Sequence, residues 1–312
     1  MKHYLSINDL GALSQAVQEG LALKKAPLAH AQLGHQKTIG LLFFNNSLRT
    51  RLSTQKAAQN LGIKVMVMNF GNEGWQLEYE DGVVMDGGKA EHIREAAQVV
   101  SQYCDIVAIR AFAGLQDREM DEKEIVLRGF MEHASIPVVN MESSVAHPLQ
   151  ALADAITLAE HSTVAKPKVV LSWAPHPKAL PHAVANSFVT MMQHQNADFV
   201  ITHPEGYDLS PSITKGCYIT HNQEEAFANA DFIYVKNWSS YSNYGQVLSQ
   251  DRNWTITQEK LGGAKFMHCL PVRRNMVVAD GVLDGNQSLV IEQANNRTYA
   301  AQLVLKRLLD TL

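Results

Sequence analysis

Residues 43–58 read FFNNSLRTRLSTQKAA and join the end of an apolar segment to the start of a helical one. The apolar segment, TIGLLFF at 38–44, is typical of a buried strand, and the helical pattern begins directly after Ser47. A buried strand that passes at once into a helix is the first half of a β-α-β unit, and such units build parallel sheets. This stretch therefore predicts an α/β fold.

The same alternation continues along the chain in two blocks. Near-continuous apolar segments separated by helical ones indicate a parallel sheet with both faces covered. We therefore expect two doubly wound parallel-sheet domains joined by helices. The expected strands are 38–44, 63–68, 105–110 and 136–141 in the first block, and 167–173, 197–203, 230–236, 264–269 and 288–293 in the second.

Helices mark the boundary between the two blocks. One is expected to begin after Pro148 and to end before Pro167, because proline is tolerated in the first turn of a helix and not in its interior. An amphipathic segment at 294–311 is expected to pack back on the first domain. The expected domains are 1–148 together with 294–312, and 149–293.

The composition argues against several classes of function. The chain has 312 residues, 46% of them hydrophobic, and its 27 Lys and Arg against 31 Asp and Glu give a net charge of -4. Nothing in this balance suggests a nucleic-acid or anionic-membrane partner. The 3 cysteines are far apart, so neither a disulfide framework nor a thiolate metal site is expected. No segment approaches about 18 apolar residues, and we expect a cytoplasmic protein.

The turn after Ser47 combines several features of an anion site. A helix N-terminus offers unpaired N–H groups and the positive end of the helix dipole, and Arg49 and Thr50 add a guanidinium and a hydroxyl. Together they predict a phosphate cradle. The alternative is that Ser47 only caps the helix while the arginines are solvated. The chain has no Walker motif and no G-x-G, which disfavours a nicotinamide oxidoreductase.

Further polar groups follow the expected strands. Arg110 ends one strand, Glu142 follows another, HPLQ at 147–150 opens the bridging helix, and HCLPVRR at 268–274 follows a strand of the second block. Singly, each fits a surface ion pair or a helix cap. Because the strands of a parallel sheet end on one edge, the groups of each block should converge. No general base can be assigned to Cys269, which disfavours a nucleophilic cysteine.

Four motifs in this order resemble the carbamoyltransferase family of aspartate and ornithine transcarbamylases. They are S-L-R-T-R at 47–51, Arg110, H-P-L-Q at 147–150 and H-C-L-P at 268–271, and the resemblance extends over effectively the full length of the chain. It implies carbamoyl phosphate as one substrate, with no metal or organic cofactor. Family members stabilise a developing oxyanion with fixed cationic donors while phosphate leaves.

The resemblance also implies roles for individual residues. Thr50, Arg110 and His147 would be catalytic, Gln150 would help to hold the carbamoyl group, and Arg297 would add a phosphate contact. The full set implied for carbamoyl phosphate is Ser47, Leu48, Arg49, Thr50, Trp75, Arg110, His147, Pro148, Leu149, Gln150, Cys269, Leu270 and Arg297.

The second substrate is indicated by DFIYVKNWSS at 231–240. Ornithine enzymes of the family carry Asp-x-Trp and then Ser-Met-Gly, and their Asp binds the α-ammonium of ornithine. This chain has Lys236-Asn237-Trp238 and no Ser-Met-Gly. A cation repels an α-ammonium but attracts an α-carboxylate, so an N-acylated ornithine is expected.

The acyl group is indicated by MDGGKAEHI at 85–93. Acetyl-specific relatives resemble this loop but carry Glu at the position of Ala90, where it would repel a second carboxylate. Ala90 leaves space and removes that charge, which favours succinyl, although succinyl relatives usually carry Pro there. The residues expected to bind the acylornithine are Glu142, His176, Lys178, Lys236, Arg273 and Ala90. Glu142 would face the side-chain amine or amide, with a cap or surface role as its alternative.

The assembly is indicated only by the family resemblance and by Trp75. It resembles a residue that enters the neighbouring subunit's carbamoyl phosphate site in a homotrimer, and core packing is the alternative. The sequence thus predicts a carbamoyltransferase that converts N-succinyl-L-ornithine to N-succinyl-L-citrulline in arginine biosynthesis. An acetylornithine enzyme and a non-catalytic anion-binding paralogue stay open as alternatives.

Overall fold

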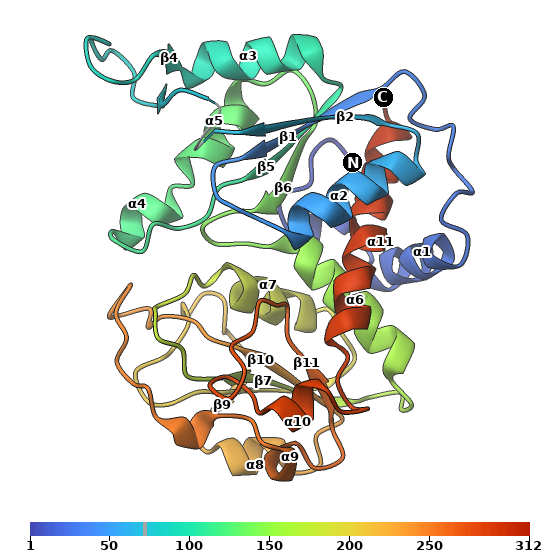
Figure 1. The fold of residues 1–312 in the computed structure, drawn as a ribbon, viewed down its shortest axis with the longest axis vertical. Helices are drawn as coiled ribbons and strands as arrows, with labels where there is room; N and C mark the ends of the chain where they lie inside the picture. Colours follow the sequence, from blue (N-terminus) through green and yellow to red (C-terminus); the bar gives the residue numbers. More distant parts are fainter. Residues whose placement is uncertain (71–73) are drawn as a thin grey trace. The chain divides into compact units, whose positions relative to one another are not determined.

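The computed structural model describes residues 1–70 and 74–312, which form two compact units (Figure 1). Unit 1 consists of residues 1–114, 118–149 and 297–312, and unit 2 of residues 115–117 and 150–296. Apart from the short segment 115–117, the chain passes from one unit to the other inside two helices, α6 (Pro148–His161) and α11 (Val290–Leu309).

Unit 1 is built on a sheet of 4 parallel strands in the order β2-β1-β5-β6. The register between β5 and β6 shifts at Ile109 and Arg110, so that Arg110 lies opposite Glu142. This shift places two oppositely charged side chains side by side at the carboxyl edge of the sheet. The strands are β1 (Thr38–Phe43), β2 (Lys64–Asn69), β5 (Ile106–Arg110) and β6 (Val138–Glu142).

Helices cover both faces of the unit 1 sheet (Figure 1). On one face α3 and α5 pack through Ile93 and Phe130 against Val107 and Ile109 of the central strand β5. On the other face lie α2 and α11. The elements are η1 (Ile7–Leu10), α1 (Leu13–Lys25), α2 (Arg49–Asn60), α3 (Ile93–Tyr103), α4 (Arg118–Glu122) and α5 (Ile125–His133), with a small parallel pair, β3 (Leu77–Glu78) and β4 (Glu91–His92).

Unit 2 contains a sheet of 5 parallel strands in the order β11-β10-β7-β8-β9. One face packs through Val170, Ile233 and Phe266 against α8, α9 and α10, and on the other face Phe188 of α7 stacks on Tyr234 with ring centroids 4.2 Å apart. The elements are β7 (Lys168–Trp173), α7 (Ala183–Met192), β8 (Asp198–Thr202), β9 (Tyr218–Thr220), α8 (Gln223–Phe227), β10 (Phe232–Lys236), η2 (Arg252–Trp254), α9 (Gln258–Leu261), β11 (Lys265–Met267) and α10 (Asp280–Leu283).

The fold class expected from the sequence is confirmed, with one strand wrong. The segment 288–293 pairs with β11 only through the single bridge between Ser288 and Phe266, and helix α11 begins at Val290. A short apolar segment fits a strand and a buried helix equally well, and here the helical spacing continues without a break. The sequence reading also missed β9, which has 3 residues.

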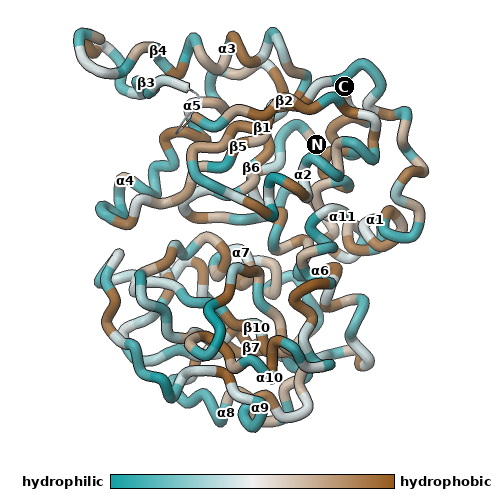
Figure 2. The backbone as a smooth tube through the Cα atoms, in the orientation of Figure 1, coloured by the Kyte–Doolittle hydropathy of each residue, from teal (hydrophilic) through white to brown (hydrophobic). Residues whose placement is uncertain are grey.

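The strands of both sheets are hydrophobic along much of their length in Figure 2, as expected for sheets covered on both faces. In the described parts of the chain, no helix is both long enough and apolar enough to cross a membrane.

Candidate active site

Each sheet has one point where consecutive connections leave in opposite directions. In unit 1 this point lies between β1 and β5, because β2 lies on one side of β1 and β5 on the other. In unit 2 it lies between β7 and β10. Ligands of open α/β sheets bind beyond the carboxyl ends of the strands at such switch points. A binding site is therefore expected among the residues that follow β1, β5, β7 and β10.

Arg110 at the end of β5 is held in one position. Its Nε donates to Glu142 Oε2 at 3.0 Å, and its Nη2 lies 2.9 Å from the same oxygen. Its Nη1 donates to the backbone oxygens of Asn45 and Asn46 at 3.0 and 2.7 Å, and the guanidinium lies over the ring of Phe112. A planar guanidinium with these contacts keeps little freedom. Arg110 also fixes the turn that leads into α2.

The turn into α2 leaves helix N–H groups without a side-chain cap. Leu48 occupies the N-cap position, and no side chain in the described residues caps this helix. The alternative that Ser47 serves as the cap is therefore wrong. The first-turn N–H groups, with Arg49 beside them, keep the capacity to bind an anion. The side chain of Leu48 is 65% exposed, so Leu48 can contribute through its backbone.

Arg297 of α11 joins this turn from the far end of the chain. Its Nη2 donates to Thr50 Oγ1 at 2.6 Å and lies 3.4 Å from His147 Nε2. His147 Nε2 is in turn 3.7 Å from Glu142 Oε2. Thr50, His147 and Arg297 are buried, so their contacts are little screened by water. Unit 1 thus combines Arg297 and Arg110 with one carboxylate, which leaves a net positive charge.

Unit 2 contains a buried polar network around Asp154 of α6. Asp154 Oδ1 accepts from Gln150 Nε2 and from Gln293 Nε2, both at 2.7 Å. Gln293 Oε1 accepts from the backbone N–H of His268 at 2.9 Å. His268 opens the H-C-L-P segment, in which Cys269 is buried and free.

A second group of side chains gathers at the switch point of unit 2. His176 Nε2 accepts from Arg273 Nε at 3.1 Å, and His176 Nδ1 is 2.8 Å from the backbone oxygen of Lys178. Burial, followed by the charges of Arg273, Lys236 and Lys178, lowers the pKa of His176, while its bond to Lys178 opposes this. Three cations therefore act on one imidazole, with Arg273 in direct contact, and this concentration of positive charge attracts carboxylates.

Lys236 is positioned by its neighbours in the chain. It ends β10 opposite Trp173 of β7. The next residue, Asn237, donates to the backbone oxygen of Ala174 at 2.7 Å, and Trp173 Nε1 donates to the backbone oxygen of Trp238 at 3.1 Å. These bonds fix the exit of the chain from β10, so the ammonium group starts from a rigid backbone.

Trp75 and Ala90 lie in the same exposed part of unit 1. Trp75 is 59% exposed, and its Nε1 donates to Glu91 Oε2 at 2.8 Å, so the alternative of core packing is wrong. The loop that carries Ala90 is held by Glu78, whose Oε1 accepts from Lys89 Nζ at 2.9 Å and from two backbone N–H groups. The Lys89 bond and these backbone bonds lower the pKa of Glu78 to about 2.

Most of the residues expected from the sequence thus fall into three groups, one in unit 1 and two in unit 2. Unit 1 brings together Arg110, His147, Thr50 and Arg297, and Glu142, expected with the acylornithine set, is paired within this group. Pro148 and Leu149, at the start of α6, are the last residues of the segment 118–149 of unit 1, and Leu149 is buried. Unit 2 holds Gln150, Cys269 and Leu270 in one network, and His176, Lys178, Lys236 and Arg273 in another group.

Sequence reasoning missed Asp154 and Gln293. Asp154 follows Gln150 by four positions on a helix, a spacing that puts both side chains on one face, so this pair could have been found. Gln293 and His268 are 25 residues apart and have no sequence signal that links them.

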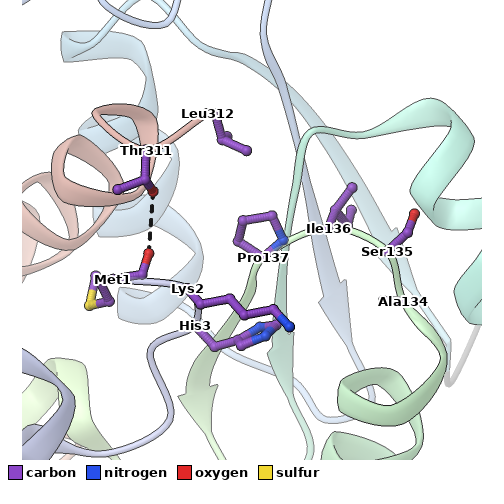
Figure 3. A pocket seen from close by; sticks show the side chains of 9 residues that line it. All are labelled: Met1, Lys2, His3, Ala134, Ser135, Ile136, Pro137, Thr311 and Leu312. Atoms are coloured by element: carbon purple, nitrogen blue, oxygen red, sulfur yellow. Dashed lines mark hydrogen bonds between the residues drawn. The ribbon is translucent and has the colours of Figure 1, made fainter.

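One hollow of unit 1 lies away from these residues. It has a volume of about 510 Å³ and is lined by residues 1–3, 134–137, 311 and 312, which Figure 3 shows around Pro137. Pro137 precedes the first residue of β6, so the hollow lies at the opposite end of that strand from Glu142. In the described residues, no group of His, Cys, Asp and Glu side chains is arranged to hold a metal ion.

Two doubly wound units, each with cationic side chains at its switch point, define a two-domain α/β protein whose sheet edges suit small anions. Residues 2–160 match the family described as aspartate/ornithine carbamoyltransferase, carbamoyl-P binding domain. Residues 181–308 match the aspartate/ornithine carbamoyltransferase, Asp/Orn binding domain. The chain belongs to the aspartate/ornithine carbamoyltransferase family.

Similar proteins of this family differ in the substrate that their names give. The chain is 49% identical to the N-succinylornithine carbamoyltransferase of Bacteroides fragilis (strain 638R) over 100% of both chains. It is 32% identical to the N-acetylornithine carbamoyltransferase of Xanthomonas campestris pv. campestris, over 99% of this chain and 98% of the relative.

A solved structure with a TM-score of 0.92 and 32% identity covers 99% of this chain and 100% of its own. It is an N-acetyl-L-ornithine transcarbamylase with a glutamate-to-alanine mutation, in complex with carbamyl phosphate and N-succinyl-L-norvaline. A structure of acetylornithine transcarbamylase with acetylcitrulline also has a TM-score of 0.92, at 31% identity, and covers 99% of both chains.

Proposed function

We propose that the protein transfers the carbamoyl group of carbamoyl phosphate to the side-chain amine of N2-succinyl-L-ornithine. The products are N-succinyl-L-citrulline and phosphate, and the reaction belongs to arginine biosynthesis. The observation that carries the choice of substrate is the group of Lys236, Lys178 and Arg273 around His176. Three cations suit a substrate with an α-carboxylate, a succinyl carboxylate and no α-ammonium.

Unit 1 supplies the groups for the carbamoyl donor in this proposal. Phosphate binds the N–H groups at the start of α2 together with Arg49 and Arg297. Thr50, Arg110 and His147 surround the carbonyl oxygen, on which negative charge develops as the amine nitrogen bonds to the carbonyl carbon. The bond from that carbon to the phosphate oxygen then breaks, phosphate leaves with the electron pair, and the nitrogen loses a proton. Fixed donors stabilise such charge without reorganisation.

Unit 2 supplies the groups for the acylornithine. Lys236 pairs with the α-carboxylate, and Arg273 and Lys178 attract the succinyl carboxylate. The identity of 49% to a protein named N-succinylornithine carbamoyltransferase supports this assignment. A related acetylornithine enzyme holds N-succinyl-L-norvaline after replacement of a glutamate by alanine, which supports the argument made for Ala90.

The proposed assembly is a homotrimer in the cytoplasm, in which Trp75 of one subunit enters the neighbouring site. The exposure of Trp75 supports this, because a large aromatic side chain at the surface is typical of a contact site. Mixing of Trp75→Ala subunits with Arg110→Ala subunits should restore part of the activity, because some sites then receive both native residues. If mixtures are no more active than their components, Trp75 does not act across subunits.

The second candidate function is carbamoylation of N-acetylornithine. It is favoured by the solved acetylornithine transcarbamylases, whose folds match with TM-scores of 0.92. A substrate panel separates the two. Purified protein is assayed for citrulline formation with carbamoyl phosphate and with free, acetylated or succinylated ornithine, and Arg110→Ala serves as the inactive control.

We expect succinylornithine to give the highest kcat/KM, by at least about tenfold over acetylornithine, because only the succinyl group brings a second carboxylate. A higher kcat/KM with acetylornithine would select the second candidate. Binding of carbamoyl phosphate without turnover of any acceptor would identify a non-catalytic paralogue.

A further inference from the structure

One hollow of unit 2 contains none of the residues assigned to either substrate. It has a volume of about 1100 Å³, and the residues that line it all belong to the segments 221–228 and 252–260. Its walls are formed by η2 and by α8 and α9, which lie side by side in Figure 1. One side chain of this hollow, Lys260 of α9, has contacts that differ from those of an ordinary surface lysine.

Lys260 is bonded to two uncharged acceptors. Its Nζ donates to Gln223 Oε1 at 2.8 Å and to the backbone oxygen of Asn253. Gln223 is 8% exposed, and its Nε2 donates to Ser172 Oγ at 3.1 Å and to the backbone oxygen of Trp254 at 3.3 Å. Because a carbonyl oxygen only accepts, the bond to Trp254 fixes which end of the Gln223 amide faces Lys260.

These two acceptors suit a neutral amine as well as an ammonium group. An ammonium group has three N–H donors, whereas a neutral amine has two donors and one lone pair. When the two donors of the amine serve Gln223 and Asn253, the lone pair lies on the remaining side of the nitrogen. Burial lowers the pKa of Lys260, and the charge of Asp251 opposes this shift. The surroundings of Lys260 therefore favour a nucleophilic amine.

The other charged groups of the hollow do not hold Lys260 as a cation. The remaining titratable side chains that line it are His221, Glu224, Arg252 and Glu259. Within residues 1–70 and 74–312, Lys260 forms no salt bridge with a carboxylate. Loss of its charge would therefore break no ion pair.

We propose that Lys260 is a site of covalent carbamoylation by cyanate. The lone pair of Nζ bonds to the carbon of isocyanic acid, the protonated form of cyanate. One electron pair of the C=N bond moves to the isocyanic nitrogen, which takes up a proton while Nζ loses one. The product is a neutral urea group, and no further reactant is needed. The urea keeps one N–H on Nζ and has two on its new nitrogen, so donors remain for both acceptors.

Carbamoyl phosphate supplies the cyanate. In water it loses a proton from nitrogen, the bond between its carbon and the phosphate oxygen breaks, and cyanate and phosphate result. This source rests on the proposed function, in which carbamoyl phosphate is the donor. The reactivity of Lys260 toward added cyanate does not depend on the proposed function.

Labelling of the native protein measures this reactivity at each lysine. The protein is exposed to a limiting concentration of potassium cyanate at about pH 8, and peptide mass spectrometry gives the initial rate of carbamoylation at each site. The rate at Lys260 should be at least about threefold higher than at Lys215, an exposed lysine of the same unit, because burial favours the neutral form of Lys260.

Two variants test the role of the uncharged surroundings. Gln223→Glu places a carboxylate against the ammonium group, so the rate at Lys260 should fall by at least about fivefold while the rate at Lys215 stays unchanged. Asn253→Asp adds a carboxylate at an exposed position that lines the hollow and should lower the rate at Lys260 by about twofold or more. It leaves the bonds of Gln223 in place and provides the test if Gln223→Glu does not fold.

Gln258→Glu is the matched control. It makes the same chemical change two positions before Lys260 on α9, where side chains do not face each other, and Gln258 bonds to Gln287. A fall in the rate at Lys260 as large as in Gln223→Glu would overturn the inference, because any added carboxylate would then have the same effect. A rate at Lys260 no higher than at Lys215 would also overturn it.

The remaining outcomes separate the site, its reagent and the proposed function. An unchanged rate at Lys260 in both Gln223→Glu and Asn253→Asp would overturn the role given to the uncharged acceptors. Labelling by added cyanate but not by carbamoyl phosphate would overturn carbamoyl phosphate as the source. Absence of citrulline formation with every acceptor, while Lys260 is still labelled by cyanate, would overturn the proposed function and support the site.

Discussion

The ion pair of Arg110 and Glu142 predicts the effect of one isosteric substitution on unit 1. In Glu142→Gln an oxygen can still accept from Arg110, but the negative charge is lost. The side chains are 10% and 14% exposed, so screening by water is weak. Breaking a fully buried pair costs about 3–5 kcal/mol, and one hydrogen bond to a charged group contributes about 1.5–3 kcal/mol. We expect a loss of about 2 kcal/mol, which is below the first range and within the second, because one acceptor remains.

Native-state hydrogen exchange measures this loss within unit 1. A cost of about 2 kcal/mol corresponds to an exchange rate about 30-fold faster for the most protected amides of β5 and β6. Asp81→Asn is the control, because it makes the same chemical change in the pair with Arg94, whose side chains are 47% and 68% exposed. Such exposed pairs contribute at most about 1 kcal/mol. Equal exchange rates in the two variants would refute the argument from burial.

Three further substitutions test the electrostatics of the two units. Ala90→Glu should lower the ratio of kcat/KM for succinylornithine to kcat/KM for acetylornithine by at least about tenfold, because two partly screened carboxylates then repel each other. An unchanged ratio in the citrulline-formation assay would contradict the proposed position of Ala90 near the acyl group. Because the pKa of His176 is lowered in the folded protein, the unfolded chain takes up a proton at this residue at higher pH than the folded chain does. The stability of the protein, measured as the midpoint of urea unfolding, should therefore fall as the pH drops below about 6.5. This fall should be less steep in His176→Gln. Because the pKa of Glu78 is about 2, its bonds to the loop should be lost only as pH falls from about 4.5 toward 2, whereas Glu78→Gln should make residues 79–90 sensitive to protease already at neutral pH.

The parts of the site that sequence could predict are those fixed by topology. Arg110 and Lys236 each follow an apolar segment, and parallel strands necessarily end on one edge of their sheet. Their positions were predictable before any distance was known. The register shift that brings Glu142 opposite Arg110 was not, because it depends on the local pairing of β5 and β6 and has no signal in either segment alone.

The parts that sequence could not predict depend on long-range contacts. Gln293 and Asp154 are 139 residues apart, and nothing in either segment indicates that the Gln293 amide donates to the Asp154 carboxylate. The sequence also could not show that Trp75 is exposed, because a lone tryptophan is more often buried than exposed. The error at 288–293 has the same origin, since whether a short apolar segment becomes strand or helix is decided by its neighbours.

Unit 1 is assembled from the first and last parts of the chain, and this affects its folding during translation. Thr50 and Asn60 find their partners in Arg297 and Gln302, which lie beyond the whole of unit 2 in the sequence. At about 5–20 residues per second, the ribosome needs on the order of ten seconds or more to synthesise the segment 150–296 in between. A nascent chain can therefore form the sheet of unit 1 early but acquires Arg297 last. A polypeptide released before residue 297 would lack this guanidinium.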